Sequence, residues 1–225
     1  MSTLVRSTAF GFAQLIVAMA IALFGPAWTL DYWQAWVFLL VFVGSAAIIT
    51  LYLWRNDPRL LERRVAAGPG AEKQTLQKLI QAVAAITFIG FLVVPSLDHR
   101  FAWSRLPVAL EIAGDVLVAI GFFIVFRVFK ENSFTAATIE VSTDQEVIST
   151  GPYAIVHHPM YAGALVMLFG TPFALSSWWG LLLMIPMTFV LVLRLFDEEK
   201  FLAKNLPGYA EYCQRVRYRL VPYVW

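Results

Sequence analysis

Long apolar runs separated by short polar segments make up most of this 225-residue chain. A helix needs ~20 mostly apolar residues to cross a bilayer. Six runs reach or approach that length, at residues 8–27, 32–53, 76–94, 106–129, 160–175 and 178–196. The fifth run is short, and Ser176-Ser177 links it to the sixth so tightly that the two are expected to form a helical hairpin. The pattern predicts an all-α integral membrane protein with about six transmembrane helices.

The composition agrees with this fold class. Hydrophobic residues make up 60% of the chain and charged residues 14%, whereas soluble domains carry about 25% charged residues. The lone Cys213 excludes an internal disulfide and a cysteine-rich metal site. We expect membrane lipid as the surroundings, and neither a metal ion nor a nucleic acid as a partner.

Two polar stretches modify this picture. After Phe196, charged and apolar residues alternate at helix-like spacing, which predicts a C-terminal amphipathic helix, or two, on the cytoplasmic face. Residues 59–65 fit a short interfacial helix with basic side chains toward lipid headgroups, or simply charge that sets the topology. One membrane domain, residues 1–225, accounts for the chain, with an N-terminal four-helix part (1–130) and a cofactor-binding catalytic part (131–225).

The basic residues lie almost entirely on one side of the six-span arrangement. Only Arg100 and Arg105 fall on the other side. Because basic residues favour the cytoplasmic side, both termini and the active site are expected to face the cytoplasm. The residues on that side are Arg6, Arg55, Arg59, Arg63, Arg64, Lys73, Lys78, Arg127, Lys130, Arg194, Lys200, Lys204, Arg215, Arg217 and Arg219. An aromatic belt is expected at the outer interface, formed by Trp28, Tyr32, Trp33, Trp36, Trp103, Trp178 and Trp179.

The fourth run contains two acids, Glu111 and Asp115, one helical turn apart on one face. An acid within a membrane span is a functional candidate. Pro107, however, predicts that this helix begins near the outer interface. Glu111 would then be in contact with water and Asp115 one turn deeper, so a structural role is favoured.

Polar chemistry gathers instead between residues 151 and 163, where the sequence reads GPYAIVHHPMYAG. Pro159 suits the first turn of the fifth helix, where a missing N–H costs nothing. A helix N-terminus carries free N–H groups and a partial positive charge, which favours binding of a carboxylate such as that of an amino-acid-like cofactor. The adjacent His157 and His158 point roughly 100° apart on a helix, which disfavours their binding one metal ion.

After the predicted hairpin, Arg194 and Glu198 share a helix face, since they are four residues apart, and Glu199 lies beside that face. One cation and two anions at the membrane surface suit a zwitterionic cofactor together with an anionic substrate. An ordinary interfacial ion pair is the alternative for Arg194 and Glu198 taken alone.

These motifs resemble those of the isoprenylcysteine carboxyl methyltransferase family and its relatives, the phospholipid N-methyltransferases. The likeness covers roughly residues 132–222 and begins with Asn132-Ser133-Phe134. The matching residues are Gly151, Tyr153, His158, Pro159, Tyr161 and Gly163, then Glu198 and Glu199, then Gly208, Tyr209, Tyr212 and Pro222. His157 departs from the pattern, because the family has Arg there, and a histidine lacks the guanidinium fork.

The resemblance implies S-adenosylmethionine as the cofactor. It implies that Glu198 holds the cofactor and that Arg194 faces a substrate carboxylate. Glu199 is a further catalytic candidate, because a carboxylate there could act as a base. The cofactor contacts that it implies are Glu146, Tyr153, Ala154, Ile155, Val156, His157, His158, Pro159, Tyr161, Val166, Met167, Leu168, Phe169 and Glu198.

The most favoured function is carboxyl O-methylation of an isoprenylcysteine-like or other lipid-like acid that enters from the bilayer. Such a carboxylate is ionised at neutral pH and needs no general base. Methylation of a phospholipid amine is the alternative, and would need a base such as Glu199. A sterol-type reductase using NADPH shares part of the motif, although Met160 and Ala164 replace the Asn and the acid usual in that group. A non-catalytic membrane scaffold remains the other alternative.

Overall fold

The computed structural model describes residues 3–65, 75–135 and 145–225. Helices dominate these residues, and the described part of the chain contains no strand beyond one isolated bridge between Val156 and Tyr218. The α-helices are α1 (Thr3–Ala27), α2 (Trp33–Asn56), α3 (Pro58–Val65), α4 (Thr75–Phe101), α5 (Val108–Glu131), α6 (Pro159–Ala174), α7 (Met184–Asn205) and α8 (Tyr209–Arg215). Two 3₁₀ turns, η1 (Gly151–Ala154) and η2 (Trp179–Leu183), precede α6 and α7. The prediction of an all-α fold is confirmed.

Five of the described helical segments are long and apolar enough to cross a membrane: α1, α2, α4, α5 and the continuous η2–α7 segment. Helix α6, which corresponds to the short fifth apolar run of the sequence, has 16 residues. The protein is therefore an all-α integral membrane protein, and its described residues form five helices of full spanning length and one shorter apolar helix, α6.

The largest changes to the predicted boundaries are at the C-terminal ends of α4 and α7. α4 continues past Val94 to Phe101, with Pro95 inside it. α7 continues through Glu198 and Glu199 to Asn205, so the first half of the polar tail extends the last span instead of forming a separate helix. Only α8 is a separate tail helix, and it buries Tyr209 and Tyr212.

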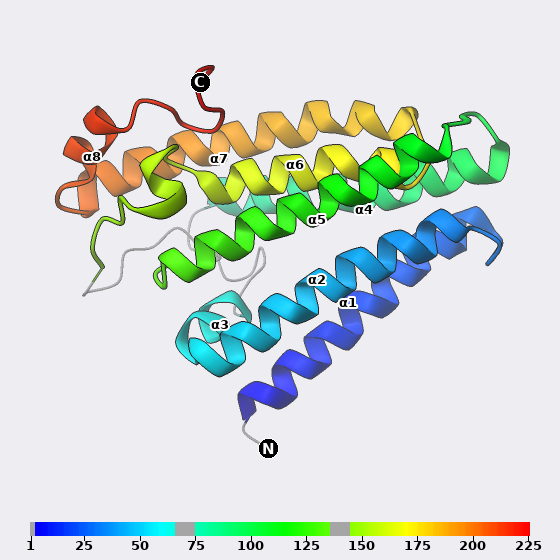
Figure 1. The fold of residues 1–225 in the computed structure, drawn as a ribbon, viewed down its shortest axis with the longest axis horizontal. Coiled ribbons are helices and arrows are strands. Elements are labelled where there is room, and N and C mark those ends of the chain that lie inside the picture. The colour runs from blue at the N-terminus through cyan, green and yellow to red at the C-terminus, as the bar shows by residue number, and fades with distance from the viewer. Residues whose placement is uncertain (1–2, 66–74, 136–144) are drawn as a thin grey trace.

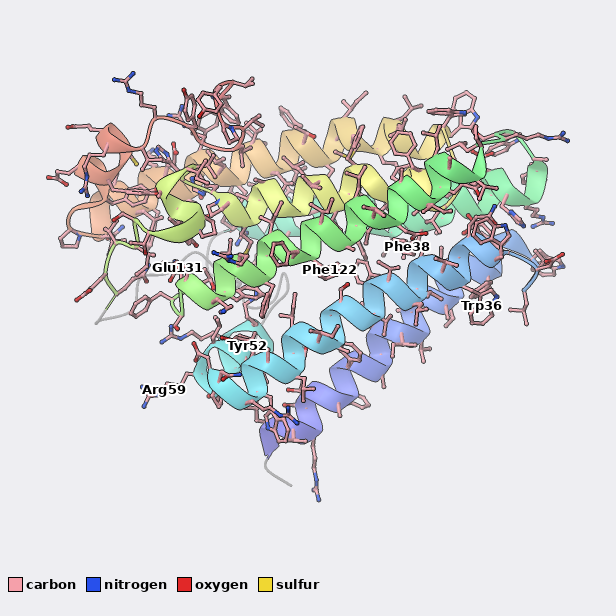
Figure 2. All side chains as sticks on the ribbon, in the orientation of Figure 1. Trp36, Phe38, Tyr52, Arg59, Phe122 and Glu131 are labelled. Atoms are coloured by element: carbon pink, nitrogen blue, oxygen red, sulfur yellow. The ribbon has the colours of Figure 1, made fainter. Side chains whose placement is uncertain are left out.

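The helices form two groups, which Figure 1 shows. α4, α5, α6 and α7 lie side by side, and the α1–α2 pair runs along one flank of this group. The core between the groups includes Leu23, Phe38, Leu92 and Val118. Phe122 of α5 (Figure 2) adds an edge-to-face contact with Phe42 of α2, at 4.9 Å between ring centroids.

The contact between α5 and α6 depends on facing glycines. A Cβ atom on Gly121 would lie 2.6 Å from the carbonyl oxygen of Gly163, and one on Gly163 would lie 3.0 Å from the carbonyl oxygen of Gly121. Backbone atoms cannot yield as flexible side chains do, so larger residues would force the helices apart. This close approach fixes the start of α6 against α5.

The α1–α2, α4–α5 and α6–η2 connections lie together at one end of the bundle (Figure 1). At this end, the predictions for Tyr32 and Glu111 are wrong. Tyr32 does not join an exposed aromatic belt: it is fully buried, donates a hydrogen bond to the Leu175 carbonyl at 2.7 Å and stacks on His99. Glu111 is only 3% exposed, because Gln34 of α2 packs over it and donates a hydrogen bond at 3.1 Å. Asp115 is also buried. The six tryptophans expected in the belt are all exposed.

Candidate active site

The start of α6 and the last turns of α7 meet at the hydroxyl of Tyr161. This hydroxyl donates a hydrogen bond to Oε2 of Glu198 at 2.5 Å and accepts one from Nε of Arg194 at 3.1 Å. The helical spacing of Arg194 and Glu198 places both on one face of α7, as predicted, and that face is turned toward α6. The structure thus joins the two motifs that the sequence separates by a hairpin.

A third helix fixes the arginine. Nη1 of Arg194 donates to Oε1 of Gln77 in α4 at 2.9 Å. The amide nitrogen of Gln77 in turn donates to Oδ2 of Asp197 at 2.5 Å. Gln77 is 1% exposed, so its amide is a buried polar group that is satisfied by two partners on α7. Sequence reasoning missed Gln77, because a polar residue in the first turn of a predicted span is usually solvated.

A cavity of about 500 Å³ opens beside these residues, within the range typical of small-molecule sites. Its lining divides into a polar part and an apolar part. The polar part includes Arg64, Tyr153, His157, His158, Arg194 and Glu198. The apolar part includes Ile80, Ala84, Phe122, Val125, Met167 and Val190. The cavity is therefore lined by both polar and apolar side chains, drawn from both halves of the chain.

The expected site residues divide between the cavity and its surroundings. Those that line it are Tyr153, His157, His158, Pro159, Tyr161, Met167, Arg194 and Glu198. Outside its lining lie Glu146, Ala154, Ile155, Val156, Val166, Leu168, Phe169 and Glu199. Helical periodicity explains part of this division: Leu168 packs against Phe91 and Met187 on another face of α6, and Phe169 is exposed.

The first turn of α6 contributes backbone groups to the site. Pro159 occupies the first helical position, and no side chain caps this end. The N–H groups of Met160 and Tyr161 consequently have no acceptor within the helix. Together with the helix dipole, they favour an anionic group at this end of α6.

Glu199 belongs to a different cluster from Glu198. Its carboxylate accepts hydrogen bonds from Nε of Arg219 at 3.0 and 3.2 Å and lies 3.0 Å from Nδ1 of His157. Nε2 of His158 lies 3.4 Å from the same carboxylate. The other ring nitrogen of His157 lies 2.5 Å from the carbonyl oxygen of Val216. Glu199 thus joins α7 to the histidine pair and to the C-terminal segment.

The C-terminal segment holds the wall of the cavity in place. The N–H groups of His157 and His158 donate to the carbonyls of Tyr218 and Arg219, both at 2.9 Å. The Tyr212 hydroxyl of α8 donates to the Tyr153 carbonyl at 2.7 Å, and burial raises the pKa of Tyr212. These bonds fix residues 153–158, which have little regular structure of their own.

The sequence of residues 59–65 fits either an interfacial helix with basic side chains toward lipid headgroups or charge that sets the topology. These residues form helix α3, but its Arg64 does not face lipid headgroups. Arg64 lines the cavity, and its guanidinium lies 5.2 Å from the ring centroid of Phe129. Arg59 does project outward from α3, as Figure 2 shows. Sequence reasoning missed Arg64, because the distance of α3 from the motif along the chain gave no sign that it packs beside the site.

Comparison with known proteins supports the superfamily resemblance. Residues 110–207 match the model of the phospholipid methyltransferase family, which shares a superfamily with the isoprenylcysteine carboxyl methyltransferases. The matched residues contain Tyr161, Arg194 and Glu198. The chain is also similar to the Delta(14)-sterol reductase TM7SF2 of Mus musculus, with 33% identity over 135 residues. That similarity covers 53% of this chain and 32% of the relative, so the chain spans about a third of that protein's length.

Proposed function

We propose that this chain is an S-adenosylmethionine-dependent membrane methyltransferase that esterifies the carboxylate of an isoprenylcysteine-like or other lipid-like acid. The observation that carries the proposal is the Tyr161 hydroxyl between Glu198 and Arg194, at the edge of a cavity with a polar and an apolar part. The match of residues 110–207 to the phospholipid methyltransferase family supports methyl transfer as the chemistry.

The polar part of the cavity fits S-adenosylmethionine. Glu198 would hold its ammonium group, and the N–H groups in the first turn of α6 would hold its carboxylate. Tyr161 orients Glu198 through its hydrogen bond. When bound, the cofactor supplies an electrophilic methyl group on a sulfonium.

Arg194 has the chemistry to bind and orient the acceptor. A guanidinium forms charge-assisted hydrogen bonds with a carboxylate, and Gln77 and Tyr161 hold this one in position. The apolar residues of the cavity suit a hydrocarbon chain. Alignment of two reactants with exclusion of water lowers a barrier by about 7–11 kcal/mol. Because a carboxylate is already ionised at neutral pH, its methylation in this cavity needs no proton acceptor.

An acid fits this site better than an amine. Arg194, which lines the cavity, can form charge-assisted hydrogen bonds with a carboxylate but not with a protonated amine. Glu199, which the amine reaction would need as a base, lies outside the cavity lining and is paired with Arg219 and His157. Both observations favour O-methylation over N-methylation.

We further propose that the site faces the cytoplasm. The end of the bundle that carries the site also carries nearly all the Lys and Arg residues, and basic residues favour the cytoplasmic side. The cofactor would enter from the cytosol and the lipid-like acceptor from the bilayer. Labelling of the variants Arg217→Cys and Arg105→Cys, which introduce a cysteine at opposite ends of the bundle, tests this orientation in intact membranes.

Transfer of a labelled methyl group tests the proposed function. Purified protein receives S-adenosylmethionine labelled in its methyl group, together with a prenylcysteine analogue, a fatty acid or an aminophospholipid. We expect base-labile labelled ester on an acid. Labelled product on the aminophospholipid alone would overturn the choice of acceptor, and the absence of label on every acceptor, with no cofactor binding, would overturn the enzyme class.

The second candidate is a sterol-type reductase that uses NADPH. The 33% identity to the mouse Delta(14)-sterol reductase favours it. Met160 and Ala164 stand against it, since they replace the polar residues usual in the reductase motif. Reduction of a sterol substrate with consumption of NADPH would establish this candidate in place of methyl transfer.

A further inference from the structure

The lipid-facing side of α7 can be followed to its end. The exposed large apolar side chains of this helix recur every three or four residues, which places them on one helix face. They are Ile185, Phe189, Leu193 and Phe196. Because α7 belongs to a segment long enough to cross a membrane, this stripe faces lipid. It ends at Phe196, where the charged residues 197–200 follow, so Phe196 marks the level at which acyl chains give way to headgroups.

The C-terminal segment packs on the end of this stripe. After α8 the chain turns back and runs along α7, as Figure 1 shows. The ring of Trp225 meets that of Phe196 edge to face, with 5.9 Å between the centroids. The guanidinium of Arg219 lies 5.7 Å from the Phe196 centroid and 5.8 Å from the Trp225 centroid. Its Nε also donates to Glu199. The segment is thus attached to α7 at the level of the headgroups.

Apolar side chains of this segment are exposed at that level. Val221 is 48% exposed and Val224 is 78% exposed. Water gives such side chains no favourable contact, whereas the boundary between headgroups and acyl chains removes their apolar surface from water. Because Trp225 packs on Phe196, the two valines extend the lipid-facing stripe of α7 onto the C-terminal segment.

Basic side chains precede these valines in the same segment. Arg215, at the end of α8, and Arg217 are both exposed. Residues 212–225 contain no Asp or Glu, so the segment itself has a uniformly positive charge. Apolar side chains that insert into the interface, together with cations at the headgroup level, are the combination that binds anionic membranes.

We infer that residues 215–225 form an interfacial surface that binds anionic phospholipids. Val221 and Val224 lie at the top of the acyl chains, and Arg215 and Arg217 contact the headgroup phosphates. The surface is separate from the cavity, and its ligand is a lipid of the surrounding membrane and not the methyl acceptor. The inference therefore goes beyond the proposed function and does not depend on it.

Quenching of a fluorophore on this segment by labelled lipids tests the inference on the full-length chain in nanodiscs. Val224→Cys is labelled in a Cys213→Ala background. The phosphatidylcholine bilayer receives increasing amounts of phosphatidylglycerol or phosphatidylcholine that carries a nitroxide near the top of one acyl chain. Both should quench, and phosphatidylglycerol should reach half-maximal quenching at a mole fraction at least about fivefold lower, since one basic residue near an anionic surface changes affinity about that much. Arg215→Gln combined with Arg217→Gln should bring the two curves together.

Arg55→Gln combined with Arg59→Gln is the matched control, because it removes the same charge from exposed positions on α2 and α3, away from α7 (Figure 1). It should keep the preference for phosphatidylglycerol. A label at position 224 that neither lipid quenches would overturn the inference, since the segment would then lie in water. Equal quenching by the two lipids with both arginines present, or a preference that survives the loss of both, would overturn it too. None of these measurements involves cofactor or methyl transfer, so they report separately from the proposed function.

Discussion

The Tyr161 hydroxyl lies between Glu198 and Arg194, donating to the carboxylate at 2.5 Å and accepting from the guanidinium at 3.1 Å. One hydroxyl thus joins the acid proposed to hold the methyl donor and the arginine proposed to hold the acceptor. Removing it should loosen both groups without deleting either charge. Tyr161→Phe is therefore the mildest substitution that probes the centre of the site.

For Tyr161→Phe we expect S-adenosylmethionine affinity to fall about threefold to tenfold, the effect of one lost hydrogen bond. The orientation of Glu198 should weaken, although its charge remains. Isothermal titration in detergent measures the change. Tyr223→Phe is the control, because Tyr223 is 88% exposed. Equal losses in the two variants would contradict a specific role for Tyr161.

Arg194→Gln should raise the KM for an acidic acceptor by roughly tenfold or more, because a charge-assisted hydrogen bond is lost. Cofactor affinity should change little, since Glu198 and the start of α6 remain. Steady-state kinetics with varied acceptor and saturating cofactor measures this. Lys200→Gln, an exposed position on the same helix, should behave as wild type. A KM that does not change in Arg194→Gln would separate this residue from the acceptor.

Glu199→Ala should reduce stability more than catalysis. The substitution deletes the acceptor for Arg219 and the partner of His157, and we expect a cost of roughly 1.5–3 kcal/mol. The thermal unfolding midpoint measures the loss, and activity per folded molecule should remain near that of wild type. Glu211→Ala, at an exposed position of α8, is the control. A selective loss of kcat with an unchanged unfolding midpoint would instead establish Glu199 as a catalytic base.

His157→Arg should retain stability and activity. A guanidinium has enough donors to bind both the Glu199 carboxylate and the Val216 carbonyl, which flank the present imidazole. His157→Leu, which offers neither donor, should lower the unfolding midpoint. Unfolding midpoints and activities of the two variants show whether His157 only connects two segments or also takes part in the reaction. A His157→Arg variant that is stable but inactive would show that the imidazole takes part in the reaction.

Gly121→Ala should destabilise the chain by about 1–3 kcal/mol, since overpacking against backbone forces α5 and α6 apart. The new Cβ would lie 2.6 Å from the Gly163 carbonyl oxygen. Gly44→Ala on α2 is the control, because a Cβ there meets nothing within 4 Å. The control should be neutral or stabilising by up to ~1 kcal/mol. Chemical unfolding in mixed micelles measures both, and equal effects would contradict close α5–α6 packing.

Apolar periodicity predicted the helices because each run must satisfy its own backbone hydrogen bonds in lipid. It was less accurate at their ends: Asn205 ends α7 well beyond the last apolar residue of the sixth run. A polar helix extension that lies beyond the bilayer has no apolar signal. Contacts between elements, such as that of Gln34 with Glu111, were also invisible, because no sequence spacing relates α2 to α5.

In the candidate site, too, contacts within one helix could be predicted from the sequence, whereas contacts between helices could not. Helical spacing was sufficient to pair Arg194 with Glu198, and the proline at position 159 was sufficient to predict the start of α6. Gln77 and Arg64 could not be predicted, since their positions depend on how α3 and α4 pack against the other helices. The roles of Glu198 and Glu199 diverge for a similar reason: one helical step turns Glu199 from the cavity toward Arg219.

Equilibrium binding of S-adenosylmethionine to the purified wild type and to Glu198→Ala, with NADPH as competitor, decides whether this chain binds the methyl donor through Glu198. We expect saturable binding to the wild type, no displacement by NADPH, and at least about tenfold weaker binding to Glu198→Ala. Binding of NADPH but not of S-adenosylmethionine, or equal cofactor affinity in the wild type and Glu198→Ala, would contradict it.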